Sequence, residues 1–215
     1  MDLITLSDPR SPISEAYRTL RTNLSFYSVD DPIRSLVVTS PAADDGKSLV
    51  AANLAVTMAQ SGRETILVDC DLRRPSLHAL FGLEPEPGLT NMILGEQGAM
   101  PLQDTGVAHL HLLSSGPKPP NPADMLGSKR VDGLIADLLQ TADFVIFDTP
   151  PALAVTDAAV LGAKVDGVLL VISAGRTRRD HAERAKETLE KAHVRIVGVT
   201  LTNASRDSMV SDYYG

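Results

Sequence analysis

Aromatic residues and cysteine are scarce in this sequence. Its 215 residues include no tryptophan and one cysteine, and the aromatic fraction is 4%. So few aromatic side chains argue against a surface that stacks nucleic-acid bases. The lone Cys70 allows no disulfide within the chain, which is typical of a protein that works in a reducing cytoplasm. We interpret Cys70 as a small buried residue rather than a nucleophile.

Long apolar runs and clusters of basic residues are also missing. No apolar run reaches the roughly 20 residues that a helix needs to cross a bilayer. The N-terminal stretch MDLITLSDPR lacks the pattern of a signal peptide. The net charge is −7 and no block of Lys or Arg occurs, which argues against a nucleic-acid partner and against direct binding to an anionic membrane. We therefore expect a cytoplasmic protein that does not insert into the membrane.

The sequence does contain a regular alternation of apolar segments. Hydrophobic residues make up 43% and charged residues 22%, the balance of a globular chain, and we expect residues 1–215 to form a single domain. Strand patterns alternate with helix patterns, which predicts an α/β fold with a mostly parallel central sheet flanked by helices on both faces. The expected strands are 36–38, 65–68, 110–113, 144–148, 166–172 and 195–201, and the expected helices begin at Ser14 or cover 49–58, 77–81, 89–94, 128–140 and 180–192.

Both ends of the chain and one internal stretch have irregular patterns. Residues 1–12 are polar and contain prolines, so we expect an extended arm, with Ser14 capping the helix that follows. Residues 116–122, GPKPPNP, are typical of a stiff surface loop. Residues 204–215 are expected to form a flexible tail that carries Tyr213 and Tyr214.

The stretch 35–62 predicts a phosphate-binding loop. A buried strand is followed by the polar turn PAADDGKS and then by a helical pattern. The turn therefore lies at the carboxyl end of a strand and the amino end of a helix, where free backbone N–H groups and the helix dipole attract anions. The Lys47 ammonium can reach the terminal phosphates, and the Ser48 hydroxyl can ligate magnesium. The predicted nucleotide-binding residues of this loop are Ala43, Asp44, Asp45, Gly46, Lys47, Ser48 and Leu49.

Three residues of the loop depart from the usual pattern. Pro41 occupies a position where the phosphate-loop pattern has glycine, and Asp44 and Asp45 stand where small residues are common. Aspartate tolerates a left-handed backbone, but carboxylates beside phosphates have an electrostatic cost. The alternative is an ordinary helix start in which Asp44 or Asp45 is the cap.

Two further strands end in acidic residues. Residues 65–68 run into Asp69 and, after Cys70, Asp71, while residues 144–147 run into Asp148. Carboxylates at i and i+2 are expected to point the same way, toward the edge where α/β sheets bind ligands. Asp148 would reach a magnesium ion or its water ligands. The alternative is that these acids only cap backbone N–H groups, and their combination with the phosphate loop argues against it.

A helix near the N-terminus presents Glu15, Arg18 and Arg21 at every third position. These charges form either a solvated helix surface or an intermolecular contact, in which two arginines and a glutamate pair with the same set on a neighbouring molecule. Spacing alone favours the solvated surface.

With these motifs in place, the sequence resembles the bacterial tyrosine kinase (BY-kinase) family of capsule and exopolysaccharide synthesis, a branch of the MinD/ParA-type P-loop ATPases. The resemblance runs from about Pro12 to Asn203 and rests on the segments SPISEAYRTLRTNL, DGKS, ILVDCDLRRP, FGLEPEPGLTNMILGE, LLSSGPKPPNPADML and FVIFDTPP. The first segment and the DxDxRRP segment distinguish this family from other P-loop ATPases. Ala42 stands where MinD/ParA relatives have a signature lysine, which favours the kinase branch.

The resemblance implies a catalytic role for Lys47, Asp69 and Asp71. The two acids would serve the metal and orient the hydroxyl of the substrate tyrosine. Mg²⁺ would be held by Ser48, Asp71 and Asp148, together with the phosphates of ATP.

The resemblance also implies two roles outside the phosphate loop. Asn203 would contact the adenine of ATP. Glu15, Arg18 and Arg21 match the family motif that mediates ring assembly, which reverses the preference for a solvated surface.

The implied activity is that of an ATP-dependent protein-tyrosine kinase that phosphorylates its own Tyr213 and Tyr214 in trans and regulates the synthesis or export of polysaccharide. Family members usually carry a longer cluster of tyrosines than these two. The implied partners are further copies of the chain and a transmembrane chain-length regulator, which would recruit the protein to the inner face of the membrane. Two alternatives stay open: a MinD/ParA-like ATPase switch and a weakly active nucleotide-binding ring scaffold.

Overall fold

A seven-stranded sheet lies at the centre of the part of the chain that the computed structural model describes, residues 3–27, 31–96 and 98–204. The sheet order is β3-β4-β2-β5-β1-β6-β7. Every neighbouring pair is parallel except β3 and β4. All six predicted strands are present, so the prediction of a mostly parallel sheet is confirmed. The strands are β1 (Ser35–Thr39), β2 (Thr65–Asp69), β3 (Gln103–Asp104), β4 (Leu110–Leu113), β5 (Phe144–Asp148), β6 (Gly167–Ser173) and β7 (Ile196–Thr202).

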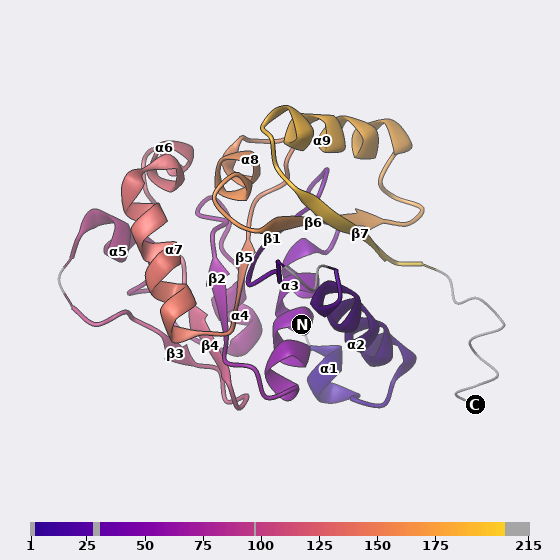
Figure 1. The fold of residues 1–215 in the computed structure, drawn as a ribbon, viewed down its shortest axis with the longest axis horizontal. Coiled ribbons are helices and arrows are strands. Elements are labelled where there is room, and N and C mark those ends of the chain that lie inside the picture. Colours follow the sequence, from indigo (N-terminus) through magenta and orange to yellow (C-terminus); the bar gives the residue numbers. More distant parts are fainter. Residues whose placement is uncertain (1–2, 28–30, 97, 205–215) are drawn as a thin grey trace.

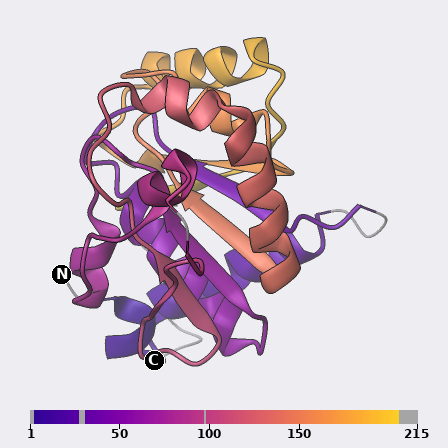
Figure 2. The ribbon, with the colours of Figure 1, turned by 90° about the vertical axis from the view of Figure 1, so that its left-hand side faces the viewer.

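Helices cover both faces of this sheet (Figure 1). One face carries α1 (Ile4–Ser7), α2 (Pro12–Ser25), α3 (Lys47–Gln60) and α4 (Leu77–Phe81). The other carries α5 (Leu89–Leu94), α6 (Pro122–Gly127), α7 (Lys129–Thr141), α8 (Asp157–Gly162) and α9 (Arg179–Lys191). Figure 2 looks from the side of α7. Among the described residues, no helix combines the length and the apolar character needed to cross a bilayer.

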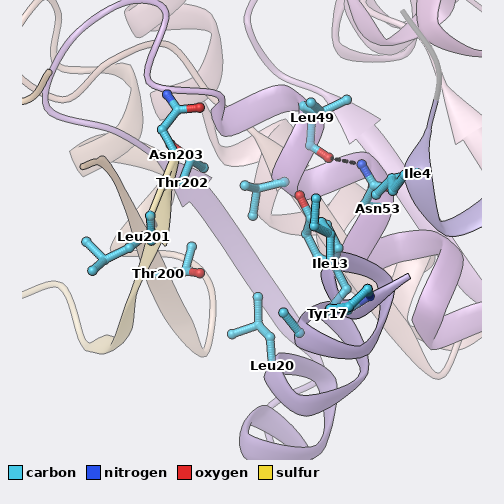
Figure 3. Close-up of a pocket in the computed structure, with 14 residues that line it drawn as sticks. Ile4, Ile13, Tyr17, Leu20, Leu49, Asn53, Thr200, Leu201, Thr202 and Asn203 are labelled. Carbon is cyan, nitrogen blue, oxygen red and sulfur yellow. Dashed lines mark hydrogen bonds between the residues drawn. The ribbon is translucent and has the colours of Figure 1, made fainter. Parts of the chain in front are cut away.

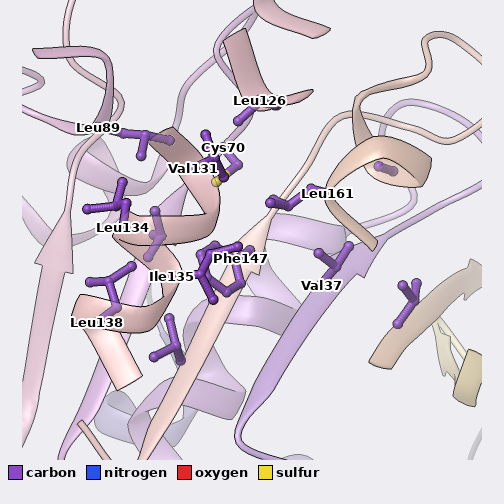
Figure 4. Packing of buried hydrophobic residues seen from close by; sticks show 14 of the residues in the cluster. Val37, Cys70, Leu89, Leu126, Val131, Leu134, Ile135, Leu138, Phe147 and Leu161 are labelled. Atoms are coloured by element: carbon purple, nitrogen blue, oxygen red, sulfur yellow. The ribbon is translucent and has the colours of Figure 1, made fainter. Parts of the chain in front are cut away.

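The core consists of two apolar layers, one on each face. Side chains alternate along a strand, so Leu36 and Val38 face α3 while Val37 faces the layer of α7 and α8, and all three are fully buried. Phe147 lies at the centre of the second layer, with side chains of α7 packed around it (Figure 4). Because both faces are covered, β1, β2 and β5 are buried along their whole length, as expected for parallel strands.

The N-terminal segment is not the extended arm that its prolines predict. It forms α1, and the buried Thr5 bonds to the side chain of Asn53 in α3, with its N–H at 3.1 Å and its hydroxyl at 2.8 Å from Oδ1. Helix α2 also starts earlier than predicted. Its cap is Ser11, which accepts a hydrogen bond from the Ser14 N–H at 3.2 Å. The prediction missed α1 because a contact with α3, far along the chain, orders the segment. The Ser11 cap did have a local signal, since Pro12 stands at the first helical position.

Short elements escaped the sequence analysis. The strand β3 has two residues, too few for an alternating pattern to emerge. Helix α6 starts at the last proline of the stretch that we predicted to be a loop, and α8 was not predicted either, although α4 and α5, of similar length, were. Of these, α8 matters most for the site, because it follows β5 and the loop after Asp148.

A matched pair of glycine substitutions tests this packing. A Cβ atom at Gly88 would lie 2.2 Å from the carbonyl oxygen of Ser114 and 2.4 Å from the N atom of Gly116, so Gly88→Ala should lower the free energy of unfolding by about 2 kcal/mol or more. Gly133, exposed within α7, has no atom within 4 Å of such a Cβ. Gly133→Ala should therefore raise the free energy of unfolding by about 0.5–1 kcal/mol, because alanine favours the helix. Urea denaturation measures the free energy of unfolding of both variants. Changes of the same sign would contradict the difference in packing between the two positions.

Candidate functional site

The loop between β1 and α3 has the backbone of an anion-binding site. Asp44 (φ 63°) and Gly46 (φ 89°) adopt the left-handed conformation, and α3 starts directly after Gly46 and runs for 14 residues. A Cβ atom at Gly46 would lie 3.4 Å from Cγ2 of Thr202, so the left-handed backbone, rather than a lack of space, favours glycine at this position. The amino end of α3 is thus presented with its free N–H groups and positive dipole, as the sequence predicts.

Lys47 connects this loop with two of the acidic strand ends. Its Nζ lies 3.0 Å from Oδ2 of Asp71 and 3.3 Å from Oδ1 of Asp148, and it donates to Oγ of Ser48 at 3.0 Å. The Ser48 hydroxyl in turn donates to Oδ2 of Asp148 at 2.5 Å. The structure therefore brings two of the acids predicted at strand ends, Asp71 and Asp148, into contact with Lys47.

Asp69 lies beside this cluster in a different environment. Its Oδ2 accepts hydrogen bonds from the N–H groups of Ser76 and Leu77, both at 3.0 Å, and its Oδ1 accepts one from the Asp71 N–H at 3.2 Å. The side chain is fully buried. Strand β2 ends at Asp69, so the strand alternation does not extend to Asp71, and the structure brings Asp71 rather than Asp69 into contact with Lys47.

Burial and neighbouring charges shift the pKa values of these groups. The pKa of Asp69 rises from 3.8 to about 7, first because of burial and then because of the charge on Asp148. Burial also raises the pKa of Asp148, although Lys47 and Ser48 oppose this shift. Burial alone would lower the pKa of Lys47, but the carboxylates of Asp148 and Asp71 raise it. The ammonium therefore stays charged at neutral pH, and Asp69 is an acid that can gain or lose a proton there.

Asp45 plays a different part from the one its position in the loop suggests. Only 4% of it is exposed. Its Oδ1 accepts from the hydroxyl of Thr177 at 2.8 Å and its Oδ2 from the Ala42 N–H at 3.1 Å, while its carbonyl oxygen accepts from the Thr202 hydroxyl at 2.8 Å. The carboxylate thus ties the phosphate loop to the loop after β6. The sequence analysis missed Thr177 and Thr202, because hydroxyls in distant segments carry no local signal.

An apolar hollow of about 580 Å³ opens between α2, α3 and the edge strand β7. Leu49, predicted for the phosphate loop, and Asn203, predicted for the adenine, both line it (Figure 3). Asn203 Nδ2 donates to Oγ of Ser173 at 2.8 Å, which leaves its Oδ1 as an acceptor. Ala43, the remaining predicted loop residue, is exposed.

The three charged residues of α2 have partners within the chain. Arg18 contacts Oε2 of Glu15 at 2.5 Å, with 32% and 40% of the two side chains exposed. Arg21 donates to the carbonyl oxygen of Thr57 in α3 at 3.0 Å. Tyr213 and Tyr214 lie outside the described residues.

The donor set at Lys47 suits magnesium bound together with a nucleotide. Among the described residues, no group of three or more His, Cys, Asp or Glu is arranged to hold a metal ion. Mg²⁺ does not require one, since it commonly takes one or two carboxylates and completes its octahedron with phosphate oxygens and water. The Ser48 hydroxyl beside the Asp148 carboxylate, with Asp71 across from Lys47, supplies oxygen ligands of the right kind.

Comparison with known proteins gives consistent results. The family model ParA, described as NUBPL iron-transfer P-loop NTPase, matches residues 33–208. The tyrosine-protein kinase YwqD of Bacillus subtilis is 44% identical over 99% of this chain and 90% of its own length. The tyrosine-protein kinase wzc of Salmonella typhi is 33% identical over 99% of this chain, which covers 30% of that protein.

Solved structures agree. The kinase domain of the Escherichia coli tyrosine kinase ETK is 33% identical, with a TM-score of 0.91 over 97% of this chain and 82% of that one. The septum site-determining protein MinD of Pyrococcus horikoshii, complexed with Mg-ADP, has a TM-score of 0.67 at 20% identity, over 84% of this chain and 76% of that one. At this identity MinD supports the fold alone.

The raised pKa of Asp69 makes a testable prediction about stability. The folded state retains a proton that the unfolded chain releases between pH 3.8 and about 7, so this group's contribution to stability is present below pH 3.8 and is lost as the pH rises to about 7. The asparagine side chain of Asp69→Asn cannot ionise, so this variant does not lose the corresponding stability as the pH rises. The variant also has a pH-independent cost, because its amide nitrogen must face one of the backbone N–H groups from which Asp69 accepts hydrogen bonds. In nucleotide-free protein, the difference in Tm between variant and wild type should therefore shift in favour of the variant by about 3 °C or more from pH 4 to pH 8. A difference in Tm that does not change with pH would contradict the assignment.

Proposed function

The chain belongs to the bacterial tyrosine-protein kinases, a branch of the ParA-type P-loop NTPases, and from that premise we propose that it uses ATP to phosphorylate its own Tyr213 and Tyr214 in trans. The tyrosine kinase activity follows from the family. Its own tail as substrate, ATP as the donor and the individual roles of the site residues are the proposal. The polysaccharide role, in which the kinase controls synthesis or export of a capsule or exopolysaccharide, is part of the same proposal.

The observation that carries the proposal is the convergence of Lys47, Ser48, Asp71 and Asp148 at the amino end of α3. The loop amides and the Lys47 ammonium would bind the β- and γ-phosphates of ATP. Phosphoryl transfer passes through a loose transition state, so positioning and charge stabilisation provide most of the catalysis. Lys47, already held among the acids, needs only a small shift of its Nζ to exchange a carboxylate for a phosphate.

Ser48, Asp148 and Asp71 would hold Mg²⁺, directly or through water. The ion, when bound, neutralises charge on the phosphates. The three side chains lie within hydrogen-bond distance of Lys47 or of one another, so they can orient a cation without rearrangement of the strands.

Asp69 would orient the incoming tyrosine hydroxyl and accept its proton late in the reaction. A phenol has an ordinary pKa of about 10 and is mostly protonated at neutral pH. A carboxylate with a pKa of about 7 is better matched to that proton than an ordinary aspartate. Full deprotonation before transfer is unnecessary because the transition state is loose.

Assembly into a ring would deliver the tail of one subunit to the site of the next. Glu15 and Arg18 pair on the exposed side of α2 and could exchange this internal partner for one on a neighbouring copy. Arg21, which bonds to Thr57, would in addition hold α2 on α3. Asn203 would contribute its Oδ1 to the adenine amino group.

A separate membrane protein is the proposed activator. The same kinase module spans 30% of wzc but 90% of YwqD, so the module occurs both within a longer chain and as a chain of this size. This activator would be a transmembrane chain-length regulator that recruits the kinase to the inner face of the membrane.

Replacing Lys47 tests the kinase proposal directly. Lys47→Met removes the ammonium without removing the loop and should lower autophosphorylation about 100-fold or more. Intact mass after incubation with Mg²⁺ and ATP measures the phosphate on the protein. Tyr213→Phe with Tyr214→Phe is the matched control, which should accept no phosphate in its tail but should still phosphorylate a tail peptide.

The same experiment separates the alternatives. Release of inorganic phosphate without any phosphoprotein would favour an ATPase switch. Nucleotide binding with neither product would favour a ring scaffold. Undiminished phosphotyrosine in Lys47→Met would refute the proposal.

A charge reversal on α2 tests the ring. Arg18→Glu disrupts an exposed pair, so it should change the free energy of unfolding by less than about 1 kcal/mol but should shift the protein to monomers in sedimentation velocity. Lys186→Glu is the matched control, since Lys186 forms a similar exposed pair with Glu190 on α9, at 3.3 Å. Equal sedimentation of wild type and Arg18→Glu at concentrations where the wild type assembles would contradict the role of α2.

A further inference from the structure

A bidentate ion pair joins two loops at the carboxyl edge of the sheet. Arg73 Nε donates to Oδ2 of Asp157 at 2.9 Å, and Nη2 donates to Oδ1 at 3.0 Å. Arg73 belongs to the loop after β2, two residues beyond Asp71, and Asp157 is the first residue of α8, which follows the loop after Asp148. The pair therefore connects the two segments whose acids contact Lys47.

Stability does not explain this pair well. The Asp157 side chain is 0% exposed, whereas that of Arg73 is 37% exposed. The burial of a carboxylate has a desolvation cost that an ion pair only offsets, and an apolar pair often gives equal stability. Moreover, Leu72 and Ala158, which adjoin the pair in sequence, are both buried in the same apolar cluster. Both segments are thus also anchored by apolar contacts to the same core cluster.

Arg73 lies within the turn that holds Asp71. The Arg74 N–H donates to Oδ1 of Asp71 at 3.0 Å, and Lys47 contacts the other carboxylate oxygen at 3.0 Å. The backbone bonding between β2 and β5 stops at the Cys70 N–H, which donates to the Asp148 carbonyl oxygen at 2.8 Å. Beyond that point, in the described part of the chain, the Arg73 side chain makes the only hydrogen bonds that link the two loops.

We propose that Arg73 is a positioning residue for phosphoryl transfer: held by Asp157, it fixes the turn after β2 so that Asp71 keeps its place opposite Lys47 and Asp148. The inference rests on the proposed role of Asp71 at the metal. The two-pronged contact requires the planar guanidinium, because a lysine at this position offers a single point contact and leaves the turn free to rotate.

The test uses a neutral pair in place of the charged one. Arg73→Gln with Asp157→Asn avoids an unpaired buried charge, and the apolar contacts of Leu72 and Ala158 should keep the double variant folded. Its kcat for autophosphorylation should fall about 10- to 100-fold, with little change in the KM for ATP, because the loop amides and Lys47 are intact. The Mg²⁺ concentration needed for half-maximal binding of a fluorescent ADP analogue should rise about tenfold.

Three further variants sharpen the result. Arg74→Gln removes the same charge from the neighbouring residue, whose exposed side chain makes no hydrogen bond within the described residues. This variant should leave the kcat and the Mg²⁺ dependence of nucleotide binding unchanged. The kcat and the Mg²⁺ dependence of Arg73→Lys should lie between those of the wild type and those of the double variant. In an Asp71→Asn background, the neutral pair should lower kcat by less than about twofold, because Arg73 acts through Asp71.

Three results would overturn the proposal. One is a folded double variant with the kcat and Mg²⁺ dependence of the wild type, and another is an equal loss of kcat in the Asp71→Asn background. A loss of activity that only follows the loss of folded protein, measured by the Tm, would also overturn it and assign the pair to stability. Failure of the proposed function is distinct, because the wild type would then form no phosphotyrosine while Mg²⁺-dependent nucleotide binding still reports on Arg73.

Discussion

The position of one ammonium group governs the carboxyl edge of this sheet. Lys47 is largely buried at the start of α3 and remains charged because Asp71 and Asp148 lie within 3.0 and 3.3 Å of it. Without the ammonium, these acids would face each other with Asp69 close by, and at least one of them would take up a proton. The contact therefore shapes both the local fold and the site, since the loops that carry the acids converge on the same charge.

This arrangement also determines how a nucleotide can enter. A triphosphate in the proposed site would compete with Asp71 and Asp148 for Lys47, so each phosphate contact that formed would release a carboxylate. The released carboxylates would then need a cation, because uncompensated charge in a water-poor site is costly. Mg²⁺ and nucleotide should accordingly bind as one unit. The acidity that seemed unfavourable in the sequence adds little to this repulsion at Asp45, since the Asp45 carboxylate is already bonded to Thr177 and the Ala42 N–H.

The features that the sequence predicted well are those with a local physical signature. An apolar run followed by Asp148 marks a buried strand and its end, and Gly46 before Lys47 marks a helix start. What could not be predicted depends on contacts between distant segments. Three contacts join residues that lie many positions apart in the chain: Thr5 with Asn53, Asp45 with Thr177 and Arg73 with Asp157. Such pairs leave no periodic pattern in the sequence. The same reason explains why the contact of Lys47 with Asp71 rather than Asp69 emerged only from the fold.

The charges that assemble the site also bear on the release of its product. Phosphorylation adds about −1.5 to −2 charges to a tyrosine at neutral pH. A phosphorylated tail in the proposed site would lie beside Asp69, Asp71 and Asp148, in a chain whose net charge is already −7. Lys47 cannot neutralise the new phosphate and the remaining diphosphate together with two carboxylates. The acids proposed to orient the substrate before transfer would therefore repel it afterwards, so a single electrostatic arrangement would favour both the entry of a neutral tyrosine and the departure of its phosphorylated form.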